Sequence, residues 1–174
     1  MKRRKTMNSE EYIKKAATFR LPSSDNKDYL YLGFMEELGE LSGKLSKRIR
    51  DTNFDITLFE KEVGDVLWFL ANIIDYKAKH FDYSVSSSVN FFQEFKPMSK
   101  AIPDYELIIA IACLFKSWVD LNTSFVYLFS ILHNLDTLRS RYSTKTLQEI
   151  AEQNIAKLED RKSRNVIKGN GDER

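Results

Sequence analysis

The chain has 174 residues, of which 43% are hydrophobic and 30% charged, and its formal net charge is +2. This composition is typical of one soluble globular domain, and the small net charge argues against a protein that coats nucleic acid. Only 6 Gly and 3 Pro are present, too few turn residues for a β-sandwich or β-barrel. The single cysteine, Cys113, excludes an intramolecular disulfide framework and a cysteine-based zinc site.

Apolar residues spaced three and four apart predict helices along most of the chain. A first short helix is expected to begin after an N-cap at Ser9 and to end near Phe19. Two long helices follow, over about residues 29–50 and 55–79, with a break at residues 51–53. The predicted apolar stripe of the second long helix consists of Leu58, Phe59, Val66, Phe69 and Ile73.

The second half of the chain begins with a serine-rich stretch over residues 82–103, which predicts loops with room for one short helix around Phe91. Two helices are then expected over residues 104–118 and 123–139. Between residues 107 and 135 the only charged side chains are those of Lys116 and Asp120. Such an apolar helix pair lies either in the centre of a fold or at an interface between subunits.

A last helix is expected to begin at Thr144 or Thr146 and to end near Arg164, followed by a loop over residues 165–174. No segment alternates as a strand does, so the predicted fold is all-α. The basic residues 2–5 lack the apolar segment of a signal peptide, and the longest apolar run, residues 107–115, is about half the roughly 20 residues of a membrane span. We therefore expect a cytoplasmic protein without a membrane partner or a stable nucleic-acid partner.

Both long helices carry a pair of acids spaced three residues apart, which places the two carboxylates of each pair on one helix face. The pairs are Glu37 with Glu40, and Glu62 with Asp65. At 100° per residue, Glu62 falls within roughly 40° of the apolar stripe of its helix, where an uncompensated carboxylate is unfavourable. Mg²⁺ or Mn²⁺ would compensate four acids that converge from two antiparallel helices.

Two alternatives to a metal site remain open. The acids are solvated, or they pair with nearby cations, namely Lys44, Lys47, Arg48 and Lys61. A di-iron site is disfavoured, because it requires a histidine three residues after a glutamate and neither His80 nor His133 has that position.

Gly39 and Gly64 lie between the two acids of their pairs, although glycine inside a helix costs about 1 kcal/mol relative to alanine. A small residue there permits close helix approach, leaves room for a ligand, or is simply tolerated.

Near the C-terminus, the spacing of Asn154, Lys157 and Arg161 places them on one helix face, which could meet phosphate oxygens. The alternative is a solvated basic helix end that complements the helix dipole.

Three stretches resemble a known family. Residues 32–41 (LGFMEELGEL) and 59–68 (FEKEVGDVLW) resemble the signature of MazG-type nucleoside triphosphate pyrophosphohydrolases. Residues 146–161 (TLQEIAEQNIAKLEDR) and 168–172 (KGNGD) resemble the C-terminal signature of the MazG-like branch. The resemblance implies one all-α domain over residues 1–174 that hydrolyses a (d)NTP to the (d)NMP and pyrophosphate, in nucleotide-pool cleaning or regulation. A guanosine alarmone hydrolase and a non-catalytic helical interaction module are the alternatives.

The resemblance also implies roles for individual residues. The catalytic residues and Mg²⁺ ligands would be Glu37, Glu40, Glu62 and Asp65, with Mn²⁺ as a possible substitute. The residues assigned to the substrate are Asn154, Lys157, Arg161, Lys168 and Trp68, of which Trp68 either stacks on the base or packs in the core. Residues 80–142 depart from the compact family pattern, as a lineage-specific insertion or a degenerate second helix pair. A homodimer or a higher homo-oligomer is expected.

Overall fold

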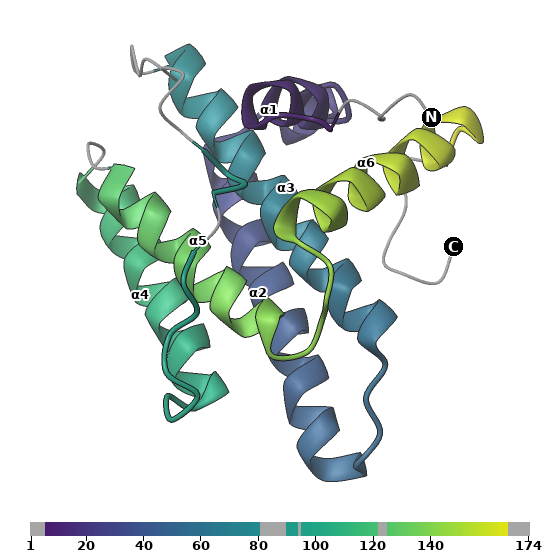
Figure 1. Cartoon of the computed structure of the whole chain (residues 1–174). Coiled ribbons are helices and arrows are strands. Elements are labelled where there is room, and N and C mark those ends of the chain that lie inside the picture. Colours follow the sequence, from purple (N-terminus) through teal and green to yellow (C-terminus); the bar gives the residue numbers. More distant parts are fainter. Residues whose placement is uncertain (1–5, 81–89, 94, 122–124, 167–174) are drawn as a thin grey trace.

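The computed structural model describes residues 6–80, 90–93, 95–121 and 125–166, and over these residues it contains helices and no strand (Figure 1). The all-α prediction is therefore confirmed. In chain order the elements are α1 (Ser9–Ala17), a 3₁₀ turn η1 (Pro22–Ser24), α2 (Lys27–Asp51), α3 (Ile56–His80), α4 (Asp104–Leu121), α5 (Phe125–Ser140) and α6 (Leu147–Ser163). Lys168 and the predicted turn over residues 169–172 lie outside the described residues.

The N-cap of α1 is Asn8, so the prediction of a cap at Ser9 is wrong. The Asn8 side chain accepts a hydrogen bond from the Glu11 amide at 2.9 Å, and the Glu11 carboxylate accepts one from the Asn8 amide at 3.0 Å. The Ser9 hydroxyl has other partners, because it donates to the Asn90 side chain at 3.2 Å and accepts from the Phe91 amide at 2.8 Å. These bonds hold the segment around Phe91 against α1.

Around Phe91, where a short helix is expected, the described residues 90–93 form a turn. The expected N-terminal part of that helix lies outside the described residues. By contrast, the predicted cap at Thr146 is confirmed. Its hydroxyl accepts from the Glu149 amide at 3.2 Å, and the Glu149 carboxylate accepts from the Thr146 amide at 2.7 Å.

Helices α2 and α3 form a long antiparallel pair that runs through the middle of the molecule (Figure 1). Helices α1 and α6 both pack against α3, and α4 packs against α2. The core contains most of the predicted apolar stripe of α3, but Leu58 is 41% exposed. The prediction that Leu58 is buried is wrong, because it lies in the first turn of α3 at the rim of a cavity between α3 and α6.

Helices α4 and α5 form a second antiparallel pair, built from the apolar segment of the sequence. Phe115 of α4 stacks on Phe34 of α2, with ring centroids 4.1 Å apart. Fully buried Lys77 of α3 donates to the Trp118 carbonyl at 3.2 Å and lies 4.5 Å from the centroid of the Trp118 ring. The apolar pair therefore shares a core with α2 and α3. None of the described helices combines the length and the hydropathy that a membrane crossing requires.

Candidate metal and phosphate site

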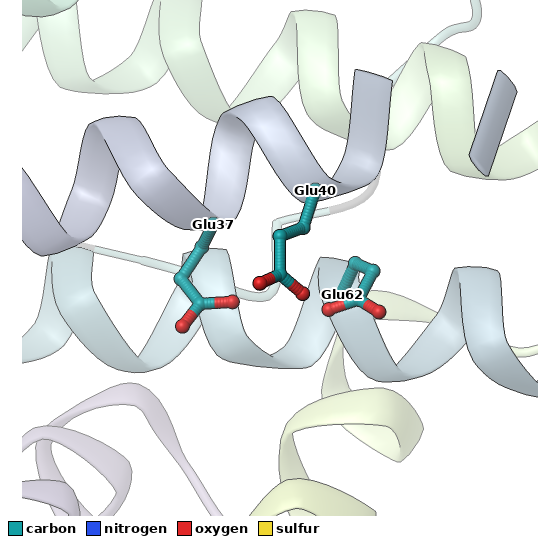
Figure 2. Close-up of side chains that lie close together, drawn as sticks. All are labelled: Glu37, Glu40 and Glu62. Carbon is teal, nitrogen blue, oxygen red and sulfur yellow. The ribbon is translucent and has the colours of Figure 1, made fainter. Parts of the chain in front are cut away.

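Three of the four predicted acids come together between α2 and α3. Glu37 and Glu40 extend from α2 toward α3, where Glu62 meets them (Figure 2). One carboxylate oxygen of each residue lies within 4.8 Å of the others. Glu62 is fully buried, Glu37 is half-buried and Glu40 is exposed. The cluster therefore has a closed end at Glu62 and an open end toward solvent at Glu40.

The cluster raises the pKa of Glu37 from its ordinary value of 4.5 to about 8. Burial is the largest cause, followed by the negative charges of Asp65, Glu40 and Glu62, while Lys157 opposes the shift. At neutral pH the carboxyl of Glu37 therefore favours its protonated form.

The buried carboxylate of Glu62 contacts a cation. Lys44 of α2, one turn beyond Glu40, places its ammonium nitrogen 3.0 Å from a Glu62 oxygen. The alternative that nearby cations compensate the acids thus holds for this residue. Another of those cations, Arg48, lies over the Tyr142 ring, with its guanidinium carbon 4.9 Å from the centroid.

The fourth acid, Asp65, is outside the three-glutamate cluster and is held by α6 instead. The Lys157 ammonium lies 2.6 and 2.8 Å from its two oxygens, and the Asn154 amide donates to one of them at 2.6 Å. Asn154 and Lys157, which are predicted to bind phosphate, therefore contact Asp65, which is predicted to bind metal. Arg161, one turn beyond Lys157, is partly exposed.

The glycines between the acids have different surroundings. A Cβ added at Gly64 would lie 3.1 Å from the Asn154 Cβ and 3.2 Å from its amide nitrogen, so glycine lets α6 come close enough for Asn154 to reach Asp65. A Cβ added at Gly39 would meet nothing within 4 Å among the described residues. Close approach therefore explains Gly64, whereas Gly39 is exposed and contacts no other helix among the described residues.

The half-buried Trp68 packs within the protein. Its ring contacts Phe69 edge-on at 4.9 Å between centroids, and its carbonyl accepts a hydrogen bond from the Asn72 side chain at 2.9 Å. Its indole N–H is buried without a hydrogen-bond partner among the described residues. These contacts are those of a core residue, and none of them involves the acids.

Sequence reasoning missed Tyr12 of α1, which is fully buried. Burial, and then the charge of Asp65, raise the pKa of its hydroxyl well above the ordinary value. The hydroxyl has no hydrogen-bond partner in the part of the chain that the structure describes. The spacing of Tyr12, Ile13 and Ala16 indicates a buried helix face, but no sequence signal points from that face to Asp65.

The three glutamates supply the type of ligand, carboxylate oxygens, that a hard divalent cation prefers. Mg²⁺ binds oxygen ligands at about 2.0–2.1 Å, so two ligands of one ion lie at most about 4.2 Å apart. The observed separations, all within 4.8 Å, need only a small closure. Asp65 could join such a site if Lys157 released it. In chemical terms, the site combines carboxylate oxygens between α2 and α3 with an ammonium and an amide group from α6.

Comparison with known proteins identifies no relative. The chain matches no family model, no curated protein and no solved structure.

Proposed function

We propose that the chain is a Mg²⁺-dependent nucleoside triphosphate pyrophosphohydrolase of the MazG-like all-α type. It would cleave a (d)NTP between the α- and β-phosphates. The main support is the convergence of Glu37 and Glu40 with the fully buried Glu62. A carboxylate so deep in a helical core needs compensation. Lys44 provides it at 3.0 Å in the metal-free protein, and a divalent cation with a bound triphosphate would take over that role.

The roles of the residues follow from their positions. Bound Mg²⁺ would neutralise phosphate charge and lower the pKa of a water molecule. The buried Glu62 keeps a fixed place between the helices, while Glu37 and Glu40 reach the same point from α2. One carboxylate of the cluster orients the attacking water and accepts its proton. Lys157 and Arg161 of α6 provide positive charge for the phosphate oxygens.

The direct test is release of pyrophosphate from a panel of NTPs and dNTPs by the purified protein with Mg²⁺. We expect release from at least one nucleotide, and on the order of a 100-fold loss in Glu62→Gln, which removes a charged metal ligand. The matched control is Asp136→Asn. Asp136 is also a buried carboxylate, but it lies on α5 and pairs with Arg139 at 2.6 Å. This control should retain the activity.

Two results would reject the proposal: no pyrophosphate from any nucleotide, or undiminished release by Glu62→Gln. Including guanosine tetraphosphate in the panel separates a general triphosphate hydrolase from an alarmone hydrolase with the same metal site.

A non-catalytic helical module is the second candidate function, and a specific observation favours it. Lys44 and Lys157 contact Glu62 and Asp65 at 3.0 and 2.6 Å, so two of the four acids are compensated within the protein itself. Under this alternative the ion pairs serve stability alone. Replacing Lys44 or Lys157 should then destabilise the fold without changing the affinity of the protein for Mn²⁺.

A further inference from the structure

We propose that Lys157 is an exchangeable counter-ion. It holds Asp65 while the site is empty and moves to a phosphate oxygen when substrate arrives, so that metal and triphosphate each promote binding of the other. This inference rests on the proposed function, because it concerns the ligands of the same site.

The first argument is the occupancy of Asp65. Lys157 lies within 2.8 Å of both its oxygens, and Asn154 donates to one of them. A metal ion that approaches Asp65 therefore meets an ammonium group on the oxygens it needs. Lys157 and a cation at Asp65 compete for the same lone pairs, and their charges repel each other.

The second argument concerns which contact can be released. The side chains of Lys157 and Asp65 are 23% and 17% exposed, so the ammonium can leave toward solvent. Asn154 is 5% exposed and packed against Gly64, so it can keep Asp65 oriented after the lysine has moved. A lysine suits this role, because its compact charge sits on a flexible stem and needs no fixed bidentate geometry.

The third argument is that two buried polar groups near Asp65 have no hydrogen-bond partner among the described residues. The hydroxyl of fully buried Tyr12 has no hydrogen-bond partner among the described residues, and neither has the buried Oδ1 atom of Asn154. The charge of Asp65 acts on the Tyr12 hydroxyl. Buried polar groups usually have a hydrogen-bond partner. The Tyr12 hydroxyl and the Asn154 side-chain oxygen therefore offer hydrogen-bonding capacity to a ligand that binds near Asp65.

A triphosphate offers Lys157 several negative oxygens in place of one carboxylate. Once Lys157 has moved to a phosphate, both oxygens of Asp65 are free of the ammonium, and a cation can use them. By linkage, a cation at Asp65 that displaces Lys157 must strengthen phosphate binding by the same factor. The lysine thus weakens metal binding at Asp65 until substrate is present.

The test is calorimetric and uses Mn²⁺ alone, inorganic tripolyphosphate alone, and both together, with the whole chain. In the unaltered protein each probe should tighten the other by about 10-fold. In Lys157→Met, Mn²⁺ alone should bind about 10-fold more tightly, tripolyphosphate should bind more weakly, and the mutual enhancement should shrink. The control is Lys145→Met, which removes a lysine paired with Glu60 at 2.6 Å and should change none of these affinities.

Opposite changes in the two affinities support the exchange, because a purely structural lysine would weaken both or neither. Weaker or unchanged Mn²⁺ binding by Lys157→Met overturns the inference, as does the absence of Mn²⁺ binding by either protein. The proposed function is tested separately, because it fails when no nucleotide releases pyrophosphate.

Discussion

The two antiparallel helix pairs have similar apolar cores and compensate their charges differently. In the α4–α5 pair, the buried carboxylate of Asp136 binds Arg139, three residues further along the same helix. In the α2–α3 pair, Glu62 contacts Lys44 from the facing helix, and Asp65 contacts the more distant α6. The buried Asp136 is therefore compensated within one helix. Glu62 and Asp65 depend on partners from other helices, which a ligand can replace.

The largest expected effect is a dependence of Mn²⁺ affinity on pH, and it should come from the α2–α3 pair alone. Because the pKa of Glu37 is raised to about 8, binding a cation below that pH must displace its proton. Mn²⁺ affinity should rise by up to about 10-fold per pH unit between pH 6 and 8, as measured by calorimetry. Glu37→Gln should flatten the profile, while Asp136→Asn on the α4–α5 pair should leave it unchanged.

The raised pKa of Glu37 also predicts how the stability of the metal-free protein changes with pH. The folded-state pKa of Glu37 exceeds its ordinary value of 4.5, so ionisation opposes folding. The contribution of Glu37 to stability is complete below about pH 4.5 and is lost as the pH rises through about 8. Urea unfolding should show that Glu37→Gln gains stability over the unaltered protein toward pH 9. A constant difference across this range would contradict the pKa of Glu37.

The next largest effect tests how tightly the α2–α3 pair is packed. A Cβ added at Gly33 would lie 2.2 Å from the Phe69 ring, so Gly33→Ala should destabilise the protein by about 1–3 kcal/mol. Gly39→Ala on the same helix meets open space and should instead stabilise it by up to about 1 kcal/mol, through helix propensity. Thermal unfolding of both variants measures the contrast. Equal effects would mean that α2 and α3 are not in close contact at Gly33.

A smaller effect is expected where the two pairs meet. Burial lowers the pKa of Lys77 to about 8, so the charged form disfavours folding at neutral pH. Each pKa unit corresponds to about 1.4 kcal/mol, partly offset by the contact with the Trp118 ring. Lys77→Met should therefore stabilise the protein by about 1–2 kcal/mol at pH 7. Since the depressed pKa makes stability rise with pH above about 8, the advantage of the variant should shrink toward pH 10.

The smallest effect concerns the hydroxyl of Tyr12. Removing a buried hydroxyl that lacks a hydrogen-bond partner should change the free energy of unfolding by about 1 kcal/mol or less, in the stabilising direction. Tyr12→Phe should show this in chemical denaturation. A loss of more than 1 kcal/mol would mean that the hydroxyl has a partner, such as a water molecule, in the metal-free protein.

Sequence periodicity predicted the helices well because burial repeats along a helix. Val66, Phe69 and Ile73 are buried as their spacing predicts, and Thr146 caps α6 through a local motif. Leu58 is the exception within its stripe. It lies in the first turn of α3 and faces the cavity between α3 and α6, whereas Phe59 in the same turn is fully buried.

The composition of the candidate site was only partly predictable. The convergence of the glutamates follows from two long helices that pair antiparallel. The partner of Asp65 does not, because Lys157 lies 92 residues away in sequence and reaches it through the packing of α6 on α3. A pattern within one helix can place Asn154 and Lys157 on a common face, but it cannot say what that face contacts.

The contact between Gly33 and Phe69 has a consequence for the axial register of α2 and α3. Seven residues further along α2 is Glu40, and seven residues back along α3 is Glu62. In an antiparallel pair these steps lead to the same point, about 10 Å from the Gly33 contact. A slip by one helical turn, about 5.4 Å, would separate the two carboxylates. The alignment of the acids is therefore set by a glycine and a phenyl ring that carry no charge.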